Sequence, residues 1–358
     1  MATKTKEDLD FLLKALVEKD GSDLHLQANS SPIFRIYGQL VSSGSDVVTS
    51  KDIEEFTFSI MHPEQKEAFS KTKHVDFSYS IEGVGRFRVN VFRQRGNVGS
   101  VMRAIPVKIA TMEQLGLPQV AKDLAAKPNG LVLVTGPTGS GKTTTLASII
   151  DHINDTQKGH IITIEDPIEF IHVNKSCVIN QRELHLDTES FSAALKDALR
   201  EDPDVILVGE MRDLETISLA ITAAETGHLV FATLHTNSAP QTIDRIIDVF
   251  PPHQQQQIRT QLAGALRGVI AQTLLRKADA SGRIAAFEVM VGNAPIRALI
   301  NDGKTNQIYS TMQVGRNDGM QTMDSALIKM VQDGLVFQEE ASIKVFDRSS
   351  FDLAVKKK

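Results

Sequence analysis

The sequence predicts an α/β protein in which a small α+β domain precedes a larger domain built on a parallel sheet. Two patterns lead to this fold class. Short alternating strand patterns separated by turns fill the first part of the chain, and from residue 130 onward apolar strands alternate with helical segments. A glycine-rich loop also joins one of those strands to a helix. We therefore expect a first domain at 1–105, a linker at 106–118 and a second domain at 119–358.

The composition is that of a soluble globular protein. Of 358 residues, 41% are hydrophobic and 23% are charged, which allows two or three domains. The single cysteine, Cys177, excludes an internal disulfide and argues against a structural zinc site. A net charge of −5 gives no general attraction to nucleic acid. Without an apolar signal core or a membrane-length apolar run, we expect a cytoplasmic protein that reaches membranes only through partners.

The first domain is expected to combine one helix with several strands. Leu9, Leu12, Leu13 and Leu16 recur at helical spacing and predict a helix within residues 1–20. Alternating apolar residues bounded by glycine turns predict strands at 23–26, 33–37, 77–79 and 86–92. Pro106 and Pro118 bracket the expected linker.

The second domain is expected to consist of βαβ units followed by helices. Predicted strands are 131–135, 161–164, 205–208 and 229–233. Predicted helices between them are 142–154, 190–200 and 214–225. The last third is expected to be mostly helical, with helices at 254–273, 294–301 and 322–334.

The glycine-rich loop fits the pattern G-x-x-x-x-G-K-[ST], which cradles nucleotide phosphates between a strand and a helix. The expected nucleotide-binding residues are Gly136, Pro137, Thr138, Gly139, Ser140, Gly141, Lys142, Thr143 and Thr144. Lys142 would reach the β- and γ-phosphates, and the Thr143 hydroxyl would hold Mg²⁺. An ordinary glycine-rich turn is the alternative, but the flanking strand and helix favour a site for ATP with Mg²⁺.

Hydrolysis also needs carboxylates, and two strand ends supply them. The strand at 205–208 leads into Glu210, which is placed to hold the metal directly or through water. The strand at 161–164 is followed by Glu165, Asp166 and Glu169. We expect Glu169 to be the general base, with Glu165 as the next candidate. The alternative is a turn cluster in which Asp166 only caps a helix.

Histidines and arginines complete the candidate site. His228 and His235 flank the strand at 229–233, which suggests γ-phosphate sensing, although either could be structural. Arginines alternate with apolar residues in the first domain, so several share one strand face. They are Arg86, Arg88, Arg93, Arg95 and Arg103. They could clamp nucleotide phosphates, from the same or a neighbouring subunit, or they could form a solvated sheet edge.

Four segments together resemble the motif boxes of the secretion ATPases, the family that powers type II and type IV secretion and type IV pili. The segments are 136–143, 164–169, 199–213 and 226–235, and the likeness extends from Gly21 to Asp324. The resemblance implies a PAS-like N-terminal domain and a RecA-like P-loop ATPase domain with C-terminal helices, assembled as a ring-shaped hexamer. It implies Lys142 and Thr143 at the phosphates and metal, Glu169 as base and Glu210 in the second acidic box. Arg88 and Arg103 match its phosphate-contacting arginines, and His228 and His235 match its histidine box.

Within the family, the chain resembles the branch that retracts type IV pili. Residues 294–300, which include Arg297, resemble the retraction signature Ala-Ile-Arg-x-x-Ile, and Cys177 alone cannot form the four-cysteine zinc insert of extension ATPases. The implied function is an ATP-driven hexamer that depolymerises pilin for twitching motility at the inner-membrane face. Implied partners are a pilus platform protein and a second retraction ATPase.

Three other functions stay open on the sequence. One is an accessory retraction ATPase, and another is a nucleotide-gated scaffold ring that barely turns over. Intact Lys142, Glu169 and Glu210 disfavour the scaffold. The third is a nucleic-acid motor, but three tyrosines and no tryptophan give little support for stacking on single strands.

Overall fold

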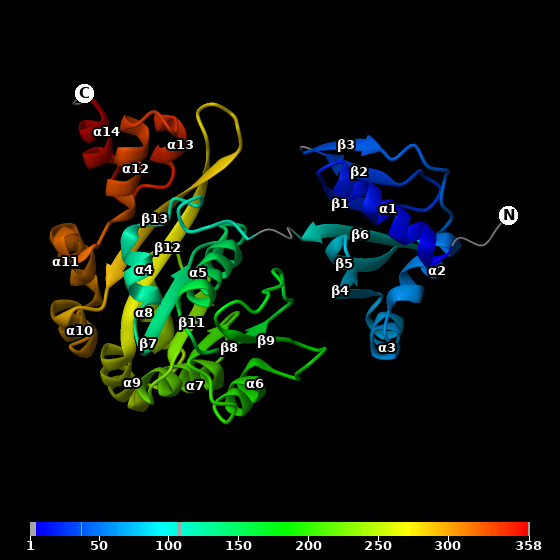
Figure 1. The fold of residues 1–358 in the computed structure, drawn as a ribbon. Coiled ribbons are helices and arrows are strands. Elements are labelled where there is room, and N and C mark those ends of the chain that lie inside the picture. The colour runs from blue at the N-terminus through cyan, green and yellow to red at the C-terminus, as the bar shows by residue number, and fades with distance from the viewer. Residues whose placement is uncertain (1–4, 37, 106–108, 357–358) are drawn as a thin grey trace. The chain divides into compact units, whose positions relative to one another are not determined.

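The computed structural model describes residues 5–36, 38–105 and 109–356, and it divides into two compact units (Figure 1). The first unit comprises residues 1–108 together with 167–171, and the second comprises 109–166 and 172–358. Each unit has its own sheet and its own core, so the predicted mixed α/β class is confirmed. Residues 106–108 of the expected linker, Tyr37 of an expected strand and the first four residues of the expected N-terminal helix lie outside the described part of the chain.

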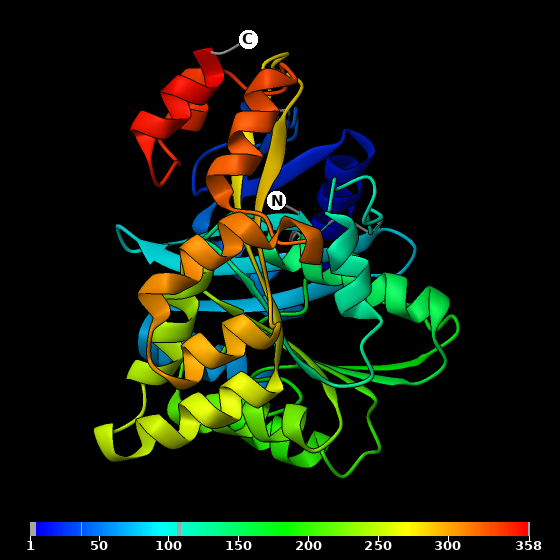
Figure 2. The same cartoon turned by 90° about the vertical axis from the view of Figure 1, so that its left-hand side faces the viewer.

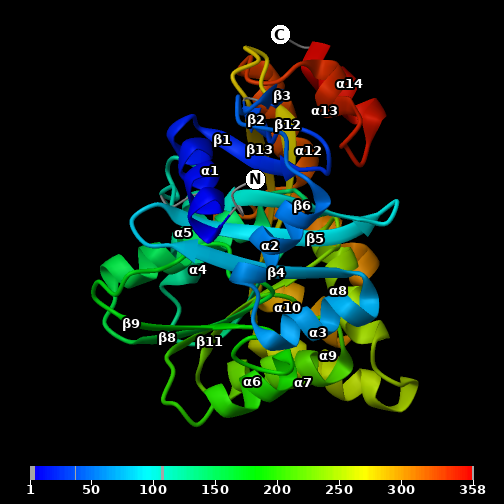
Figure 3. The same ribbon diagram turned by 90° about the vertical axis from the view of Figure 1, so that its right-hand side faces the viewer.

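The first unit is a six-stranded antiparallel sheet in the order β3-β2-β1-β6-β5-β4, with three helices. Its elements are α1 (Lys6–Glu18), β1 (Gly21–Leu26), β2 (Ile33–Ile36), β3 (Gln39–Ser42), α2 (Ser50–Ile60), α3 (Pro63–Thr72), β4 (His74–Ile81), β5 (Gly85–Gln94) and β6 (Asn97–Ile105). Helices α1 and α2 pack against each other and on β6, while α3 packs on β4 (Figure 3). Helices α2 and α3 and strands β3 and β6 were missed in the sequence.

The pleat of β5 separates an apolar face from a charged face. Phe87, Val89 and Val91 are buried in the core that α1 and α2 cover, whereas Arg88 is exposed. Because neighbouring residues of a strand point to opposite faces, Arg88 lies on the face away from those helices. Arg103 of β6 stands directly opposite Arg88 in the ladder, so both arginines share this open face.

The second unit is built on a seven-stranded sheet in the order β13-β12-β7-β11-β10-β8-β9. All neighbouring strands are parallel except β12 and β13. Its sheet and the helices around it are α4 (Gln119–Ala125), β7 (Gly130–Thr135), α5 (Lys142–Thr156), β8 (His160–Glu165), β9 (Val178–Glu183), α6 (Phe191–Ala198), β10 (Val205–Val208), α7 (Leu214–Glu225), β11 (Leu229–Leu234), α8 (Ala239–Asp248), α9 (Pro252–Ala265), β12 (Leu266–Arg276) and β13 (Arg283–Val291).

Strand β7 is an interior strand of this sheet, between β12 and β11, and it is buried on both faces. Leu131 and Leu133 pack in the core formed with α7, whereas Val132 and Val134 pack in the core formed with α5. Helices therefore cover both faces, as a parallel sheet requires. The carboxyl end of β7, where the glycine-rich loop begins, is consequently held from both sides.

The predicted helix at 254–273 is wrong in its second half. Helix α9 ends at Ala265, and the chain continues as β12, which pairs in parallel with β7. Leu266, Val269, Ile270 and Leu274 recur at helical spacing, although the same segment also fits a strand buried on both faces. The free edge of β7 decides in favour of the strand, and β13 adds to it as an antiparallel neighbour.

A further small core of the second unit joins the C-terminal helices to the β12–β13 hairpin. The last elements are α10 (Ala294–Asn301), η1 (Thr305–Gln307), α11 (Ile308–Val314), η2 (Gly315–Asp318), α12 (Met323–Gln332), α13 (Gln338–Ser342) and α14 (Arg348–Lys356). Leu327 and Phe351 pack there with Leu275 and Ala286 of the hairpin. Figure 2 shows the orange-to-red helices beside the yellow hairpin. Within the described residues, no helix combines the length and the apolar character needed to span a membrane.

One buried carboxylate ties two helices to the sheet. Glu288 of β13 is 2% exposed and accepts hydrogen bonds from the backbone N–H groups of Ala239 (2.7 Å) and Met323 (3.3 Å). These are the first residues of α8 and α12, whose N–H groups have no partners within their own helices. Burial raises the pKa of Glu288, and the two N–H donors act in the opposite direction.

We predict that Glu288→Ala lowers the free energy of unfolding by about 2–4 kcal/mol, because two helix starts lose their acceptor and a cavity forms. Urea unfolding followed by circular dichroism measures the loss. Glu339→Ala, an exposed glutamate on α13, is the control and should change the unfolding free energy by less than about 0.5 kcal/mol. Equal stability of the two variants would contradict the capping role.

Candidate active site

The loop between β7 and α5 has a backbone that only glycine tolerates at two positions. Gly136 has φ +147° and Gly141 has φ +91°. A Cβ on Gly136 would lie 2.3 Å from the backbone oxygen of Gln272 on β12. Helix α5 begins directly after Gly141, so its free N–H groups and positive dipole end face the hollow of the loop.

Lys142 lies folded over this loop. Its Nζ donates to the backbone oxygens of Gly136 (2.8 Å) and Pro137 (3.2 Å). Burial lowers the pKa of Lys142, and the nearby carboxylate of Glu210 partly offsets this effect. A phosphate in the hollow would offer the ammonium stronger, charged acceptors than these two carbonyl oxygens.

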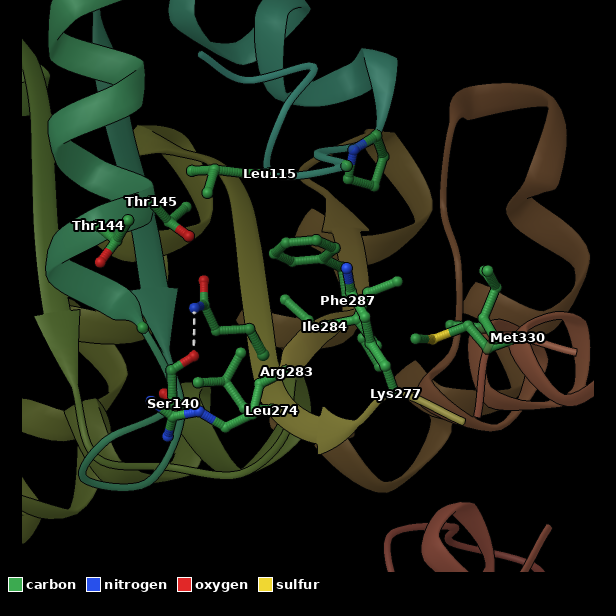
Figure 4. Close-up of a pocket in the computed structure, with 18 of the residues that line it drawn as sticks. Leu115, Ser140, Thr144, Thr145, Leu274, Lys277, Arg283, Ile284, Phe287 and Met330 are labelled. Atoms are coloured by element: carbon green, nitrogen blue, oxygen red, sulfur yellow. Dashed lines mark hydrogen bonds between the residues drawn. The ribbon is translucent and has the colours of Figure 1, made fainter. Parts of the chain in front are cut away.

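A cavity of about 770 Å³ opens beside the loop (Figure 4). Thr144 and Thr145 of α5 form one wall. Leu274, Ile284, Phe287 and Met330 contribute apolar surface, and Lys277, Arg283 and Lys329 contribute positive charge. Polar and apolar groups therefore share the lining, which suits a ligand that has both kinds of surface.

Glu210 is held rigidly just after β10. The N–H of Gly209 donates to Ile164 (2.7 Å), and the Thr233 hydroxyl donates to the Gly209 oxygen (2.5 Å), so strands on both sides fix the turn. Gly209 allows this approach, because a Cβ there would lie 3.0 Å from the Ile164 oxygen.

The Glu210 carboxylate contacts two basic side chains. Arg212 Nη2 lies 2.7 Å from one of its oxygens, and His235 Nε2 lies 3.2 Å from the other. Burial alone would raise the pKa of Glu210, but Arg212 and His235 together hold it below its usual range. Glu210 is therefore ionised at neutral pH. Sequence reasoning missed Arg212, although it stands two residues after Glu210 in the same motif box.

The two histidines lie at opposite ends of strand β11. His235 follows β11 at its carboxyl end, the edge that carries the glycine-rich loop. His228 precedes β11, and its Nδ1 lies 3.0 Å from the backbone oxygen of Ala223 at the end of α7. Six strand residues separate the two histidines, roughly 20 Å. Of the two histidines predicted to sense the γ-phosphate, His235 lies at the end of β11 that carries the loop, and His228 of the same chain lies at the other end.

The carboxylates after β8 differ in how they are engaged. Glu165 is 7% exposed and accepts from the Thr163 hydroxyl (2.7 Å) and the Gln181 amide (3.2 Å). Glu169 belongs to the segment 167–171, which groups with the first unit, and is more open. Its carboxylate lies 4.0 Å from Arg88 Nη1.

Arg88 and Arg103 are brought together, and a buried aspartate supports them. Asp23 of β1 is 4% exposed, and Arg103 Nε donates to it at 2.8 Å. Burial would raise the pKa of Asp23, but Ser22 and Arg103 hold it below its usual range. Sequence reasoning missed Asp23. Its strand, Gly-Ser-Asp-Leu-His-Leu, has no pattern that singles this carboxylate out.

The magnesium ion expected from the sequence has a suitable set of oxygen donors. In the part of the chain that the structure describes, no group of three or more His, Cys, Asp or Glu side chains is arranged to hold a metal. Magnesium in phosphate sites typically keeps several waters and takes only one or two protein oxygens. The Thr143 hydroxyl and the ionised Glu210 carboxylate are donors of that kind.

Comparison with known proteins agrees with this fold and site. A family model described as Type II/IV secretion system protein matches residues 86–343. The chain is 50% identical to the type IV pilus retraction ATPase PilT of Pseudomonas aeruginosa, over 94% of this chain and 98% of that protein. It is 48% identical to a twitching motility protein of Neisseria gonorrhoeae, over 87% of this chain and 83% of that protein.

Solved structures agree as well. A crystal structure of the pilus retraction motor PilT with bound ADP superposes with a TM-score of 0.89 at 45% identity, covering 98% of this chain and 99% of that one. The ATPase DotB of Legionella pneumophila superposes with a TM-score of 0.85 at 27% identity, covering 96% of each chain.

The chain therefore belongs to the type II/IV secretion system protein family, as its motif boxes predicted. Within that family, the predicted resemblance to the pilus retraction ATPases is confirmed, because the chain is 50% identical to PilT over 94% of its length. The predicted enzyme class, a P-loop ATPase, is that of these relatives.

We predict that His235→Ala lowers ATP turnover by about tenfold or more, because Glu210 loses one of its two basic partners at the loop edge. The matched change His228→Ala, at the other end of the same strand, should alter turnover by less than about twofold. Steady-state phosphate release at saturating MgATP measures both. Equal losses in the two variants would contradict the separation of the histidines.

Proposed function

We propose that the chain is a hexameric motor that couples ATP hydrolysis to retraction of a type IV pilus by pilin depolymerisation. The observation that carries the proposal is the convergence of Lys142, Glu210 and His235 at one edge of one sheet, within a chain half-identical to PilT. The motor would act at the inner-membrane face through a pilus platform protein, beside a second retraction ATPase, and thereby drive twitching motility.

The nucleotide would bind along the carboxyl edge of the sheet. Its phosphates would occupy the loop of residues 136–144, where Lys142 exchanges its two carbonyl contacts for phosphate oxygens. The nucleoside would enter the adjacent cavity, where Leu274, Ile284 and Phe287 offer apolar surface. The relative with bound ADP supports a nucleotide of this class.

Magnesium would be held by Thr143 and Glu210. The ion would neutralise phosphate charge that develops during transfer. Arg212 and His235 each contact one oxygen of Glu210, which leaves acceptor positions through which this carboxylate would hold the ion directly or through water. His235 would then report the state of the γ-phosphate through its contact with Glu210.

The remaining catalytic groups would be Glu169, Arg88 and Arg103. Glu165 is buried and engaged by Thr163 and Gln181, whereas Glu169 is more exposed and its carboxylate lies 4.0 Å from Arg88, which favours Glu169 as the base that orients water. Two adjacent arginines on an uncovered sheet face repel each other, and bound phosphate would relieve that repulsion. They could act within one chain or on the nucleotide of a neighbouring subunit.

We predict that Glu169→Gln keeps ATP binding but lowers turnover by about 10²–10⁴-fold, because the amide cannot accept the proton of the attacking water. Bound nucleotide and released phosphate are measured on the same sample. Glu165→Gln is the control and should retain most of the turnover. If the losses are reversed, the base is Glu165.

The alternative functions differ in the ATP turnover that they predict for the purified chain. An accessory retraction ATPase remains a candidate because PilU of Pseudomonas aeruginosa is 40% identical over 98% of this chain and 91% of that protein. A scaffold ring with little turnover would show nucleotide binding without phosphate release. ATP turnover of the purified chain, with and without single-stranded DNA, separates the motor from the scaffold and from a nucleic-acid motor.

The helix expected to act in retraction presents one arginine beside an apolar face. Ile296 and Ile300 of α10 are fully buried, and Leu299 packs against the same core. Arg297 is half-buried, and its Nε has no hydrogen-bond partner among the described residues. Burial lowers the pKa of neighbouring Arg267, and the charge of Arg297 adds to this effect. A pair of arginines so placed suits an acidic partner.

We predict that Arg297→Ala preserves folding, hexamer formation and most ATP turnover but abolishes pilus retraction, because the residue serves force transmission or docking rather than chemistry. Twitching zones and surface pilin in a strain carrying only this variant provide the readout. Arg316→Ala, an exposed arginine of η2, should twitch normally, and Lys142→Ala should lose both turnover and twitching. Normal twitching with Arg297→Ala would return that arginine to an ordinary surface role.

A further inference from the structure

Gln272 of β12 is a buried polar side chain that contacts the glycine-rich loop from the neighbouring strand. It is 2% exposed, and its Nε2 donates to the backbone oxygen of Ser140 at 2.7 Å. The two residues are 132 positions apart in the chain. The dashed line at Ser140 in Figure 4 marks this bond, which reaches the loop beside the cavity.

The chemistry of the amide determines how the side chain is oriented. A backbone carbonyl oxygen only accepts hydrogen bonds, so the NH₂ of Gln272 faces Ser140 and its Oε1 points elsewhere. Oε1 is buried and has no hydrogen-bond partner among the described residues. A buried amide with one unused half is costly to keep, which suggests that the contact with the loop has a use beyond packing.

The rigid peptide plane transmits this contact to the phosphate site. In a trans peptide, the Ser140 oxygen and the Gly141 N–H point in opposite directions. Holding the oxygen against β12 therefore aims the Gly141 N–H away from β12. Gly141 has φ +91°, a conformation in which this peptide could otherwise rotate easily.

The same strand also supports the beginning of the loop. A Cβ on Gly136 would lie 2.3 Å from the backbone oxygen of Gln272, and a Cβ on Gly141 would lie 3.2 Å from Nε2 of the same glutamine. One residue of β12 thus contacts both ends of the loop, through its backbone at Gly136 and its side chain at Ser140. Neither contact involves Lys142 or Thr143.

We infer that Gln272 is a positioning residue for phosphate binding, which orients the Ser140–Gly141 peptide so that its N–H faces the bound phosphates. The inference rests on the phosphate site of the proposed function. It requires Gln272 to act on the phosphates alone, regardless of the nucleoside. Inorganic pyrophosphate and ADP should therefore depend on this side chain to the same extent.

Gln272→Met keeps the size of the side chain but removes the donor. Calorimetric titration in the presence of Mg²⁺ should show about tenfold weaker binding of both pyrophosphate and ADP, because the Ser140 oxygen loses its partner. Gln272→Glu, which has nearly the same shape but no amide donor, should lose at least as much. The melting temperature of each unliganded variant establishes that it is folded.

Gln157→Met is the matched control. The Gln157 amide also donates to a backbone oxygen of the second unit, that of Ala125 at 2.9 Å, but it lies just past the far end of α5 from the loop. This variant should bind both probes like the unchanged protein. The NMR amide resonance of Gly141 in glycine-labelled protein gives a readout that does not depend on affinity. It should shift when pyrophosphate is added to the unchanged protein and shift far less in Gln272→Met.

Each outcome separates this inference from the proposed function. If the unchanged protein binds neither probe, the phosphate site itself is wrong. If it binds both and a folded Gln272→Met binds both equally well, the positioning role is overturned. If Gln272→Met weakens ADP but not pyrophosphate, Gln272 acts on the nucleoside instead, which also overturns the inference.

Discussion

The pairing of β7 between β11 and β12 is the constraint on which the candidate site depends. Burial of alternate side chains in two separate cores leaves this strand no freedom to slide or rotate. Its carboxyl end therefore places the loop at a fixed point. The parallel direction of β8, β10 and β11 brings Glu165, Glu210 and His235 to the same edge.

Charge balance at that edge follows from the fixed backbone. Glu210 is partly buried and stays ionised because Arg212 and His235 contact it, and its charge in turn favours the protonated form of half-buried Lys142. Each group thus stabilises the charge state that the next one needs. A phosphate with a magnesium ion would enter a set of charges that is already arranged, which lowers the cost of reorganisation during hydrolysis.

The first unit shows the same logic on an antiparallel sheet. Arg88 and Arg103 are cross-strand neighbours on the face that α1 and α2 leave uncovered; Asp23 contacts Arg103, and Glu169 lies near Arg88. Strand register therefore sets the positions of the two guanidinium groups. Both side chains remain partly exposed, so N–H donors are left that a phosphate could engage.

The sequence by itself determined two things. These are the secondary-structure elements whose residue patterns fit only one type of element, and the chemistry of the main motifs. The glycine-rich loop, the apolar strands β7, β8, β10 and β11 and the carboxylates that follow two of them are local signals, because turn geometry and strand burial each constrain a few adjacent residues. Only the tertiary structure decided the rest. It assigned residues 266–276 to β12, since a segment whose apolar spacing fits both a helix and a strand becomes a strand when a sheet edge is open to it. It also separated His228 from His235, paired Arg103 with Asp23 and placed Gln272 against Ser140. These are contacts between distant or oppositely directed groups, and spacing along a chain carries no information about which strand becomes the neighbour of another.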